Sequence, residues 1–418
     1  MRIPTRLIFI FCIVFLFIGG LGVYISTGIA AAVRGMNGSG ARIVLMLFWS
    51  EQLLLFAGLG FLLWNMLVRR KRNERMVKII GTTLVICLVP LLVFAAFLLL
   101  EDGYRLLAGT IQWIIPNDHK WVFPPRSALY NRLVAIPVIA LLFGIFYGVT
   151  RGKYRYKVHR VALTFPNLPE AFDGLTITQL SDIHAGSFDN PEKVRQAIEL
   201  VNAQQSDLLF FTGDLVNNKA SEMTPWISIF NQTTAKLGKF SILGNHDYGD
   251  YVNWPSQSHK DANLEQLCAV HEQIGFNLLK NESVKIKRDG SFIELLGVEN
   301  WGSGSFAKYG NLDKTLEGTS AESFKILLSH DPSHWKEQVV KHEDAIQLTL
   351  SGHTHGMQFG FEYKKLRFSP VQFRYKEWAG LYQENERFLY VNRGFGFLGF
   401  PGRVGIWPEI TVFTLRRK

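Results

Sequence analysis

Residues 175–186 of this 418-residue chain read LTITQLSDIHAG. The first six residues are typical of a β-strand, and Asp182-Ile-His184 follows where that strand is expected to end. Asp182 and His184 are two residues apart, so on an extended backbone both side chains would point to the same side. A carboxylate and an imidazole together suit a divalent metal ion. The stretch therefore predicts a strand that delivers two metal ligands to one edge of a sheet.

Later blocks repeat this arrangement of a short apolar run followed by polar residues. The expected strands are 207–211, 240–243, 324–328 and 347–350, with a last strand at 409–415. Helical spacing is expected between them at 191–202 and 224–237. The polar blocks are Gly213-Asp214, Gly244-Asn-His-Asp247, Ser329-His-Asp331 and Gly352-His-Thr-His355. Each block falls beyond the carboxyl end of a strand, which is where open α/β sheets build their sites.

The residue types in these blocks are those that bind a pair of divalent metals. Asp214 can bridge two ions because a carboxylate has two oxygens. The other candidate ligands are Asn245, His330, His353 and His355. Because the set mixes nitrogen and oxygen donors, it suits Mn, Fe, Zn or Co and does not choose among them.

Taken in order, the five blocks resemble the calcineurin-like metallophosphoesterases, over about residues 156–418. The stretches 180–186 and 352–356 look most like the membrane-anchored bacterial branch. The resemblance implies an α/β domain of two packed β-sheets flanked by helices, and a divided set of metal ligands. One metal would take Asp182, His184, Asp214 and His355. The other would take Asp214, Asn245, His330 and His353.

The resemblance also implies a catalytic role for His246, which would face the substrate and protonate the leaving oxygen. Asp247 would orient the ring of His246; the alternative is a histidine that is simply bonded into its turn. Tyr248 begins an insertion that is expected to form a rim of the substrate pocket. Arg403, in a segment rich in glycine and phenylalanine, is a candidate for binding phosphate, or else lies in a core-packing loop.

The N-terminal part of the chain is apolar enough to cross a membrane. Four long apolar runs fit the ~30 Å of bilayer hydrocarbon, and they lie at 7–25, 43–68, 79–100 and 133–149. The chain is therefore divided into a transmembrane region, 1–150, and a metallophosphoesterase domain, 151–418. The first run could instead be a cleaved signal peptide, although its cleavage pattern is poor. Residues 104–115 are expected to form either an interfacial helix or an ordinary loop.

Lys and Arg predict the orientation in the membrane. Thirteen of them lie on the side of the N-terminus and of the catalytic domain, against six on the other side, which predicts a cytoplasmic catalytic domain. Segments 69–78 and 151–160 account for the whole net charge of +10. This location indicates contact with anionic membrane lipid rather than with nucleic acid.

The expected function is a membrane-anchored, dinuclear-metal hydrolase of phosphate mono- or diesters or anhydrides, with lipid-linked molecules as one substrate class. The alternatives are a nuclease or cyclic-nucleotide phosphodiesterase on the same fold, or a non-enzymatic membrane sensor. Loss of metal ligands would mark a sensor, and every ligand position is filled here. The physiological substrate, the metals and the oligomeric state are not determined by the sequence.

Overall fold

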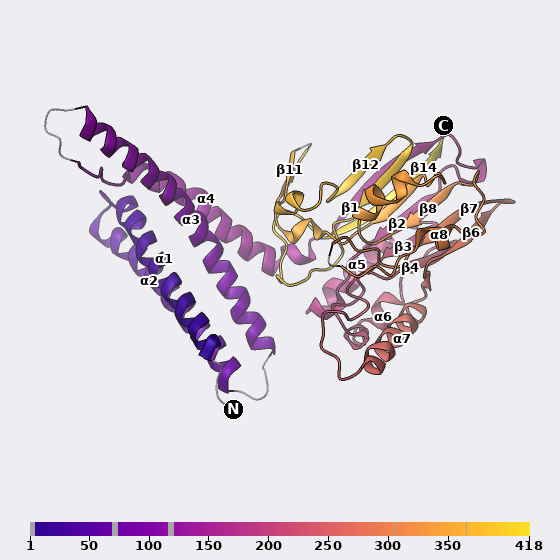
Figure 1. Ribbon diagram of the computed structural model, residues 1–418, viewed down its shortest axis with the longest axis horizontal. Coiled ribbons are helices and arrows are strands. Elements are labelled where there is room, and N and C mark those ends of the chain that lie inside the picture. Colours follow the sequence, from indigo (N-terminus) through magenta and orange to yellow (C-terminus); the bar gives the residue numbers. More distant parts are fainter. Residues whose placement is uncertain (1–4, 69–73, 116–120, 305, 365) are drawn as a thin grey trace. The chain divides into compact units, whose positions relative to one another are not determined.

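The computed structural model describes residues 5–68, 74–115, 121–304, 306–364 and 366–418. Arg2, the basic residues at 69–72 and Lys120, which enter the orientation count, lie outside this described part. Contacts divide the chain into an N-terminal unit, Met1–Phe146, and a C-terminal unit, Tyr147–Lys418 (Figure 1).

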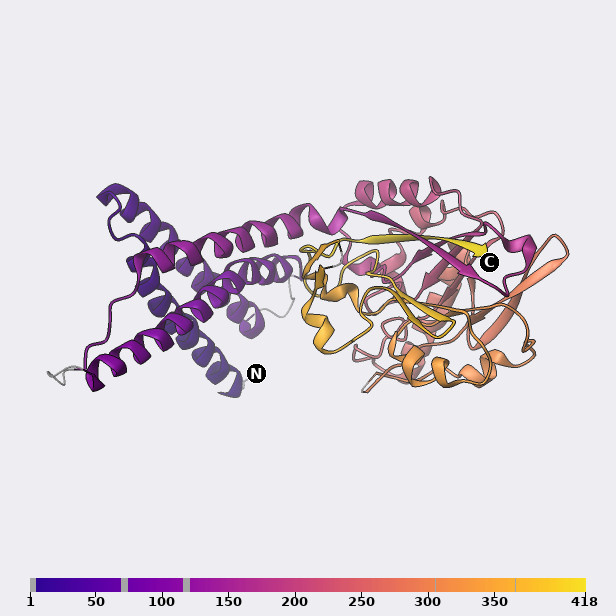
Figure 2. The same cartoon turned by 90° about the horizontal axis from the view of Figure 1, so that it is seen from above.

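Long helices make up the N-terminal unit (Figure 2). Four helices in the described part are long and apolar enough to span a membrane, and the chain is an integral membrane protein. They are α1 (Thr5–Ala32), α2 (Gly38–Val68), α3 (Glu74–Ile114) and α4 (Ala128–Thr150). Ile25, Leu55 and Leu98 are buried where the helices pack together.

Helix α3 continues through most of the segment in which an interfacial helix or a loop was expected. Its continuation carries Glu101 into a buried position, where the carboxylate accepts hydrogen bonds from Arg126 (2.9 Å) and from the backbone N–H of Ser127 (2.7 Å). The amide of Asn131 donates to the same carboxylate at 3.0 Å. These partners compensate for burying the charge, so the helix extends without a break.

In the described part of the C-terminal unit, the strands form two six-stranded sheets and a separate two-stranded ribbon. The first sheet, in the order β1-β14-β2-β3-β4-β5, is parallel except where β14 meets β2. Its strands are β1 (Lys157–Phe165), β2 (Thr176–Leu180), β3 (Leu208–Thr212), β4 (Gly238–Ile242), β5 (Asn277–Leu278) and β14 (Glu409–Arg417).

The second sheet has the order β12-β13-β9-β8-β7-β6. Its strands are β6 (Glu282–Arg288), β7 (Ser291–Gly297), β8 (Lys325–Leu328), β9 (Leu348–Ser351), β12 (Gly380–Glu384) and β13 (Arg387–Val391). The ribbon consists of β10 (Phe361–Tyr363) and β11 (Leu366–Phe368). Ile177 and Phe210 of the first sheet share a buried core with Leu295 and Leu328 of the second, so the two sheets pack face to face.

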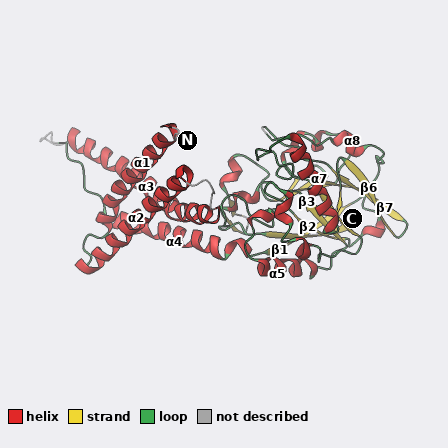
Figure 3. Ribbon diagram, turned by 90° about the horizontal axis from the view of Figure 1, so that it is seen from below, coloured by secondary structure: helices red, strands yellow, loops and turns green. Residues whose placement is uncertain are grey.

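Helices flank the sheets (Figure 3). They are α5 (Pro191–Asn202), α6 (Ile227–Phe230), α7 (Gln257–Gln273), α8 (Leu312–Leu316) and α9 (Ser333–Glu337). Helix α5 begins where Asn190 caps the N–H of Lys193 and Pro191 occupies the first turn, as helix-start chemistry requires. The fold confirms the predicted class, four transmembrane helices followed by a domain of mixed sheets flanked by helices.

The helix expected at 224–237 is much shorter in the structure, where only Ile227–Phe230 is α-helical. The backbone N–H of Leu237 bonds to Asp207 O at 2.7 Å, and that of Lys236 bonds to Ser206 O. These bonds join the chain to the start of β3 just before β4 begins. Local helical spacing was therefore overridden by pairing between distant segments.

Candidate metal centre and active site

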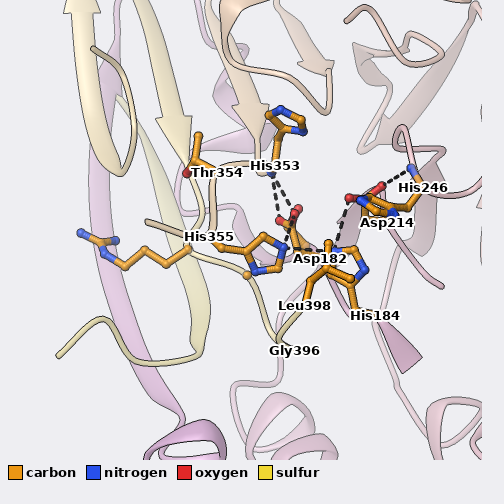
Figure 4. Close-up of polar contacts among 12 residues, drawn as sticks. Asp182, His184, Asp214, His246, His353, Thr354, His355, Gly396 and Leu398 are labelled. Atoms are coloured by element: carbon orange, nitrogen blue, oxygen red, sulfur yellow. Dashed lines mark hydrogen bonds and ion pairs between the residues drawn. The ribbon is translucent and has the colours of Figure 1, made fainter. Parts of the chain in front are cut away.

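The site lies beyond the carboxyl ends of β2, β3, β4, β8 and β9, in the C-terminal unit (Figure 4). Asp182 and His184 follow β2 and are completely buried. The N–H of Asp182 donates to Gly213 O (2.9 Å), and the N–H of His184 donates to Asp214 O (3.1 Å). The end of β2 is thus attached to the segment after β3, which brings the first two blocks together.

Asp214 lies between two histidines. One of its carboxylate oxygens is 3.4 Å from His184 Nε2 and 3.2 Å from His330 Nε2. Its other oxygen accepts the backbone N–H of His246 at 2.9 Å. Asp214 is only 2% exposed, so it is a buried acid held between two candidate ligands, His184 and His330, and the backbone of a third block at His246.

His355 completes the arrangement around Asp182. Its Nε2 lies 3.2 Å from a carboxylate oxygen of Asp182 and 3.0 Å from His184 Nε2. Two groups of side chains bring their ligand atoms within 4.8 Å of one another. They are Asp182 with His184 and His355, and Asp182 with Asp214 and His330. The two groups overlap at Asp182.

The remaining predicted ligands, Asn245 and His353, contact each other. Asn245 Oδ1 lies 2.9 Å from His353 Nδ1, and the ring of His353 is 5.2 Å from the ring of His330. The backbone N–H of His353 donates to the carboxylate of Asp182 at 3.0 Å. All seven predicted ligand positions thus lie in one contiguous cluster, although they span more than 170 residues of sequence.

The ligand positions have unusual backbone geometry. Positive backbone φ angles, which residues other than glycine rarely adopt, occur at five of the seven candidate ligands. These are Asp182 (51°), His184 (47°), Asp214 (62°), His353 (72°) and His355 (50°). The expected extended backbone between Asp182 and His184 is therefore wrong, because both residues turn to reach the site. Strain of this kind persists where surrounding contacts hold it and is concentrated at functional sites.

Two glycines in the polar blocks let the backbone lie close to the carboxylates of the candidate ligands. A Cβ at Gly244 would lie 2.3 Å from Asp214 Oδ1, and one at Gly352 would lie 2.3 Å from Asp182 Oδ2. Any side chain there would push a ligand carboxylate out of place. The glycines that precede the polar residues therefore belong to the site.

The chemistry of this cluster fits divalent metal ions. His330 Nδ1 is 2.7 Å from Thr212 O and donates its proton there, so the buried Nε2, whose contact is the Asp214 carboxylate at 3.2 Å, faces the other candidate ligands. Burial opposes the ionised form of Asp214, yet the charges of His330 and His246 hold the pKa of that carboxyl well below its usual value. Although burial opposes its charged form, the field of Asp214 raises the pKa of His330 to about 10. The cluster therefore favours positive charge, which a bound cation supplies.

His246 lies beside the ligands without being one of them. Its ring is 5.0 Å from the ring of His184 and 4.6 Å from that of Tyr251. Its Nδ1 is 2.7 Å from the carbonyl of Asn217, so Nδ1–H donates there and Nε2 remains for another partner. Burial lowers the pKa of His246, although Asp214 opposes the shift.

Asp247 does not orient the ring of His246, which corrects the expectation from sequence. Its carboxylate accepts backbone N–H groups on the loop after β3 and from Gly244. These donors are Asp214 (2.9 Å), Leu215 (2.8 Å), Val216 (3.2 Å) and Gly244 (2.9 Å). Asp247 therefore fixes the loop that carries Asp214, and the Asn217 carbonyl orients His246.

Neither residue expected to contact substrate is in a position to do so. Arg403 is fully buried, and its guanidinium donates to the carbonyls of Arg393 (2.7 Å) and Gly396 (2.6 Å) while one nitrogen lies 3.2 Å from His355 Nδ1. Tyr248 is 3% exposed, and its ring stacks on Tyr309 with centroids 4.0 Å apart. Arg403 therefore contacts the candidate ligand His355, and Tyr248 belongs to the core.

Two tyrosines that contact the ligands were missed. The hydroxyl of Tyr251, which is half exposed, accepts from Asn245 Nδ2 at 2.9 Å. The hydroxyl of Tyr375 lies 2.9 Å from His353 Nε2. Tyr251 belongs to the insertion that was expected to form a rim of the substrate pocket, so the sequence already placed its segment near the site. Tyr375 lies 22 residues beyond His353, and no sequence motif connected it with the site.

Comparison with known proteins agrees with this geometry. Residues 175–357 match the family model described as calcineurin-like phosphoesterase. Residues 5–153 match a model described as the transmembrane domain of a probable calcineurin-like phosphoesterase. A Bacillus subtilis protein described as the uncharacterized metallophosphoesterase YkuE is 32% identical over 298 residues, which cover 70% of this chain and 97% of the relative.

A second relative comes from Danio rerio and is described as a transmembrane protein with metallophosphoesterase domain. It is 29% identical over 70% of this chain, and the match covers 64% of its own length. Membrane helices joined to such a metal-binding fold define a class of membrane-bound metal-dependent phosphoesterases. This chain belongs to the calcineurin-like metallophosphoesterase family and is a metal-dependent phosphoester hydrolase.

Proposed function

We propose that the chain is a dinuclear-metal hydrolase that acts on phosphate mono- or diesters or anhydrides of lipid-linked molecules. The observation that carries this proposal is the position of Asp214, which has one carboxylate oxygen 3.4 Å from His184 Nε2 and 3.2 Å from His330 Nε2. A carboxylate between two sets of donors is suited to bridge two ions. The same chain carries four helices that are long and apolar enough to span a membrane, which motivates the choice of lipid-linked substrates.

The ligands would divide as the family pattern implies. One ion would be held by Asp182, His184, Asp214 and His355, and the other by Asp214, Asn245, His330 and His353. Divalent ions bound there would neutralise phosphate charge and activate water for attack on phosphorus.

The chain's own residues would then complete the site. His246 stands next to the ligands with Nδ1–H anchored on Asn217 O. Its Nε2 would first take a proton to form the imidazolium, and that Nε2–H could then protonate the leaving oxygen. The hydroxyls of Tyr251 and Tyr375 contact Asn245 and His353 and would help to orient them. Asp247 holds the Asp214 loop through three backbone hydrogen bonds and its own turn through a fourth, from Gly244.

The test uses the full chain in detergent, stripped of metal and then titrated with Mn, Zn, Fe or Co. Metal content is measured by mass spectrometry, and hydrolysis is measured on a panel of phosphate esters that includes lipid-linked ones. Two ions per chain at full activity support the dinuclear site. Full activity with one ion per chain, or no hydrolysis of any ester with any metal, contradicts it.

The orientation predicted from Lys and Arg places the C-terminal unit on the cytoplasmic side. We propose this orientation and test it by labelling single cysteines in intact cells with an impermeant reagent. A cysteine at the exposed Asp289 should be protected until the cells are opened. Ready labelling in intact cells would reverse the orientation.

A further inference from the structure

The ribbon of β10 and β11 has an apolar face that points away from its domain. Phe361 pairs with Phe368 across the ribbon, and Tyr363 pairs with Leu366, so these four side chains share one face. Phe361 is 53% exposed, Tyr363 66%, Leu366 69%, and the neighbouring Phe373 82%. We call these residues the hairpin face: Phe361, Tyr363, Leu366, Phe368 and Phe373.

Glu362 and Arg367, which pair across the ribbon, both bond to groups of the domain, although Arg367 remains exposed. Glu362 lies 2.6 Å from Arg393, which is itself only 6% exposed and anchored on Glu409. Arg367 donates to the backbone carbonyl of Ala379. Antiparallel sheets in soluble domains usually turn their apolar face to the core and their polar face to water. This ribbon does the reverse, so its outer face is suited to an apolar environment.

Within the C-terminal unit, the base of the hairpin is linked by hydrogen bonds to the last residues of α4. The N–H of Gly360, at the base of β10, donates to Val404 O at 2.9 Å. The N–H of the preceding Arg403 donates to Gly148 O at 3.1 Å. Gly148 belongs to the last turns of the spanning helix α4, which ends at Thr150. Two hydrogen-bonded steps therefore connect the hairpin to the end of a membrane helix.

The charges around the hairpin suit an anionic surface. Residues 361–377 contain five Lys and Arg but only two Glu, and one of the two, Glu362, is paired with Arg393. Lys364, Arg374 and Lys376 are exposed. Aromatic residues with basic neighbours are typical of segments that lie at the interface between lipid and water.

We propose that the hairpin face docks into the headgroup region of the membrane that α4 crosses, and that anionic phospholipids strengthen the contact. The same segment reaches the candidate metal centre, because Tyr375 contacts His353 and Ser369 donates to Gly356 O at 2.7 Å. Docking would therefore hold the mouth of the site at the lipid surface. This inference concerns binding and does not depend on the proposed substrate.

The test places a polarity-sensitive fluorophore on single cysteines of the full chain, in which Cys12, Cys87 and Cys268 are replaced by Ser. The sites are Leu366→Cys and Phe373→Cys on the hairpin, and Phe292→Cys as control. Phe292 is also exposed, but it lies on β7, next to the opposite edge of the second sheet from β12. The chain is placed one copy per nanodisc, in phosphatidylcholine with or without phosphatidylglycerol, and spin-labelled lipids act as the quencher.

The proposal expects quenching at positions 366 and 373 that is at least about twofold stronger than at position 292, and that increases with phosphatidylglycerol. Equal quenching at all three sites overturns it. Burial of the probes only when several copies share one bilayer also overturns it, in favour of contact between copies of the chain.

A second measurement avoids the cysteine variants. Hydrogen exchange of the unmodified chain should slow at 361–368 in anionic nanodiscs compared with a detergent of neutral headgroup, while exchange at 282–297 stays the same. Unchanged exchange at 361–368 would contradict docking even if the labelled variants were misfolded.

Discussion

Two buried clusters of charged side chains differ in how their charges are balanced. In the N-terminal unit, Glu101 and Asp102 face Arg126 at 2.9 Å, and Asp102 also pairs with Arg105 at 2.6 Å. In the C-terminal unit, Asp182 and Asp214 face histidines, and within the described residues neither carboxylate forms an ion pair with Lys or Arg.

The first cluster is complete within the chain, whereas the second needs cations to complete it. A buried carboxylate is costly unless it is paired, and Arg126 meets that need for the N-terminal cluster. In the C-terminal cluster the imidazoles balance the carboxylate charges only in part, and imidazoles are also good metal ligands. A cluster whose charges balance within the chain is suited to holding helices together, whereas a cluster that needs cations is suited to metal chemistry. Each of the following substitutions tests this distinction.

The largest effect is expected at Asp214. Asp214→Asn removes the charge between the two ligand groups, so bound metal and hydrolysis should fall together, with activity reduced by more than the 10–100-fold typical of outer-shell changes. Metal content and turnover are measured side by side. The control is Asp261→Asn, an exposed aspartate on α7 that should change neither quantity. Full metal content with normal turnover in Asp214→Asn would remove Asp214 from the site.

His246 is expected to affect the rate without affecting the metals. His246→Ala should leave metal content unchanged and lower kcat by roughly 10²–10⁴-fold, the usual scale for a positioned proton donor. The loss should be smaller for nitrophenyl esters, whose leaving group needs little protonation, and larger for alkyl esters. Equal losses on both kinds of ester would mean that His246 positions phosphate instead.

Arg403 is expected to act through His355. Arg403→Gln removes the hydrogen bonds that hold the carbonyls of Arg393 and Gly396 behind that ligand. Metal affinity should fall by roughly 10–100-fold, as for other outer-shell groups, while kcat at saturating metal changes less. Arg416→Gln, on the surface, is the matched control. A loss of kcat that excess metal does not rescue would indicate a direct catalytic role.

Arg126 is expected to affect stability alone. Arg126→Ala leaves Glu101 buried without its charged partner, which typically costs about 3–5 kcal/mol. The melting temperature of the full chain in detergent should fall clearly, and the exposed Arg42→Ala should have little effect. Adding Glu101→Gln to Arg126→Ala should recover part of the loss, since the unpaired charge is then gone. No recovery would show that packing, rather than charge, explains the effect.

Much of the site could be predicted because its ligands follow strands that the local pattern reveals. The seven ligand positions occur in five short blocks, and residue type alone indicates metal chemistry. The roles of Arg403, Tyr248 and Asp247 could not be predicted in this way. Each depends on which backbone or ring lies opposite the side chain, and those partners are not adjacent in sequence.

The sequence by itself determined the four apolar spans, the order of the strands' polar blocks and the chemical class of the site, because hydrophobic length, periodicity and ligand type are local properties. Only the tertiary structure decided that five ligands adopt positive φ, that Tyr251 and Tyr375 reach Asn245 and His353, and that the ribbon at 361–368 turns its apolar face outward. These features depend on contacts between residues far apart in the chain, which a reading of local pattern does not contain.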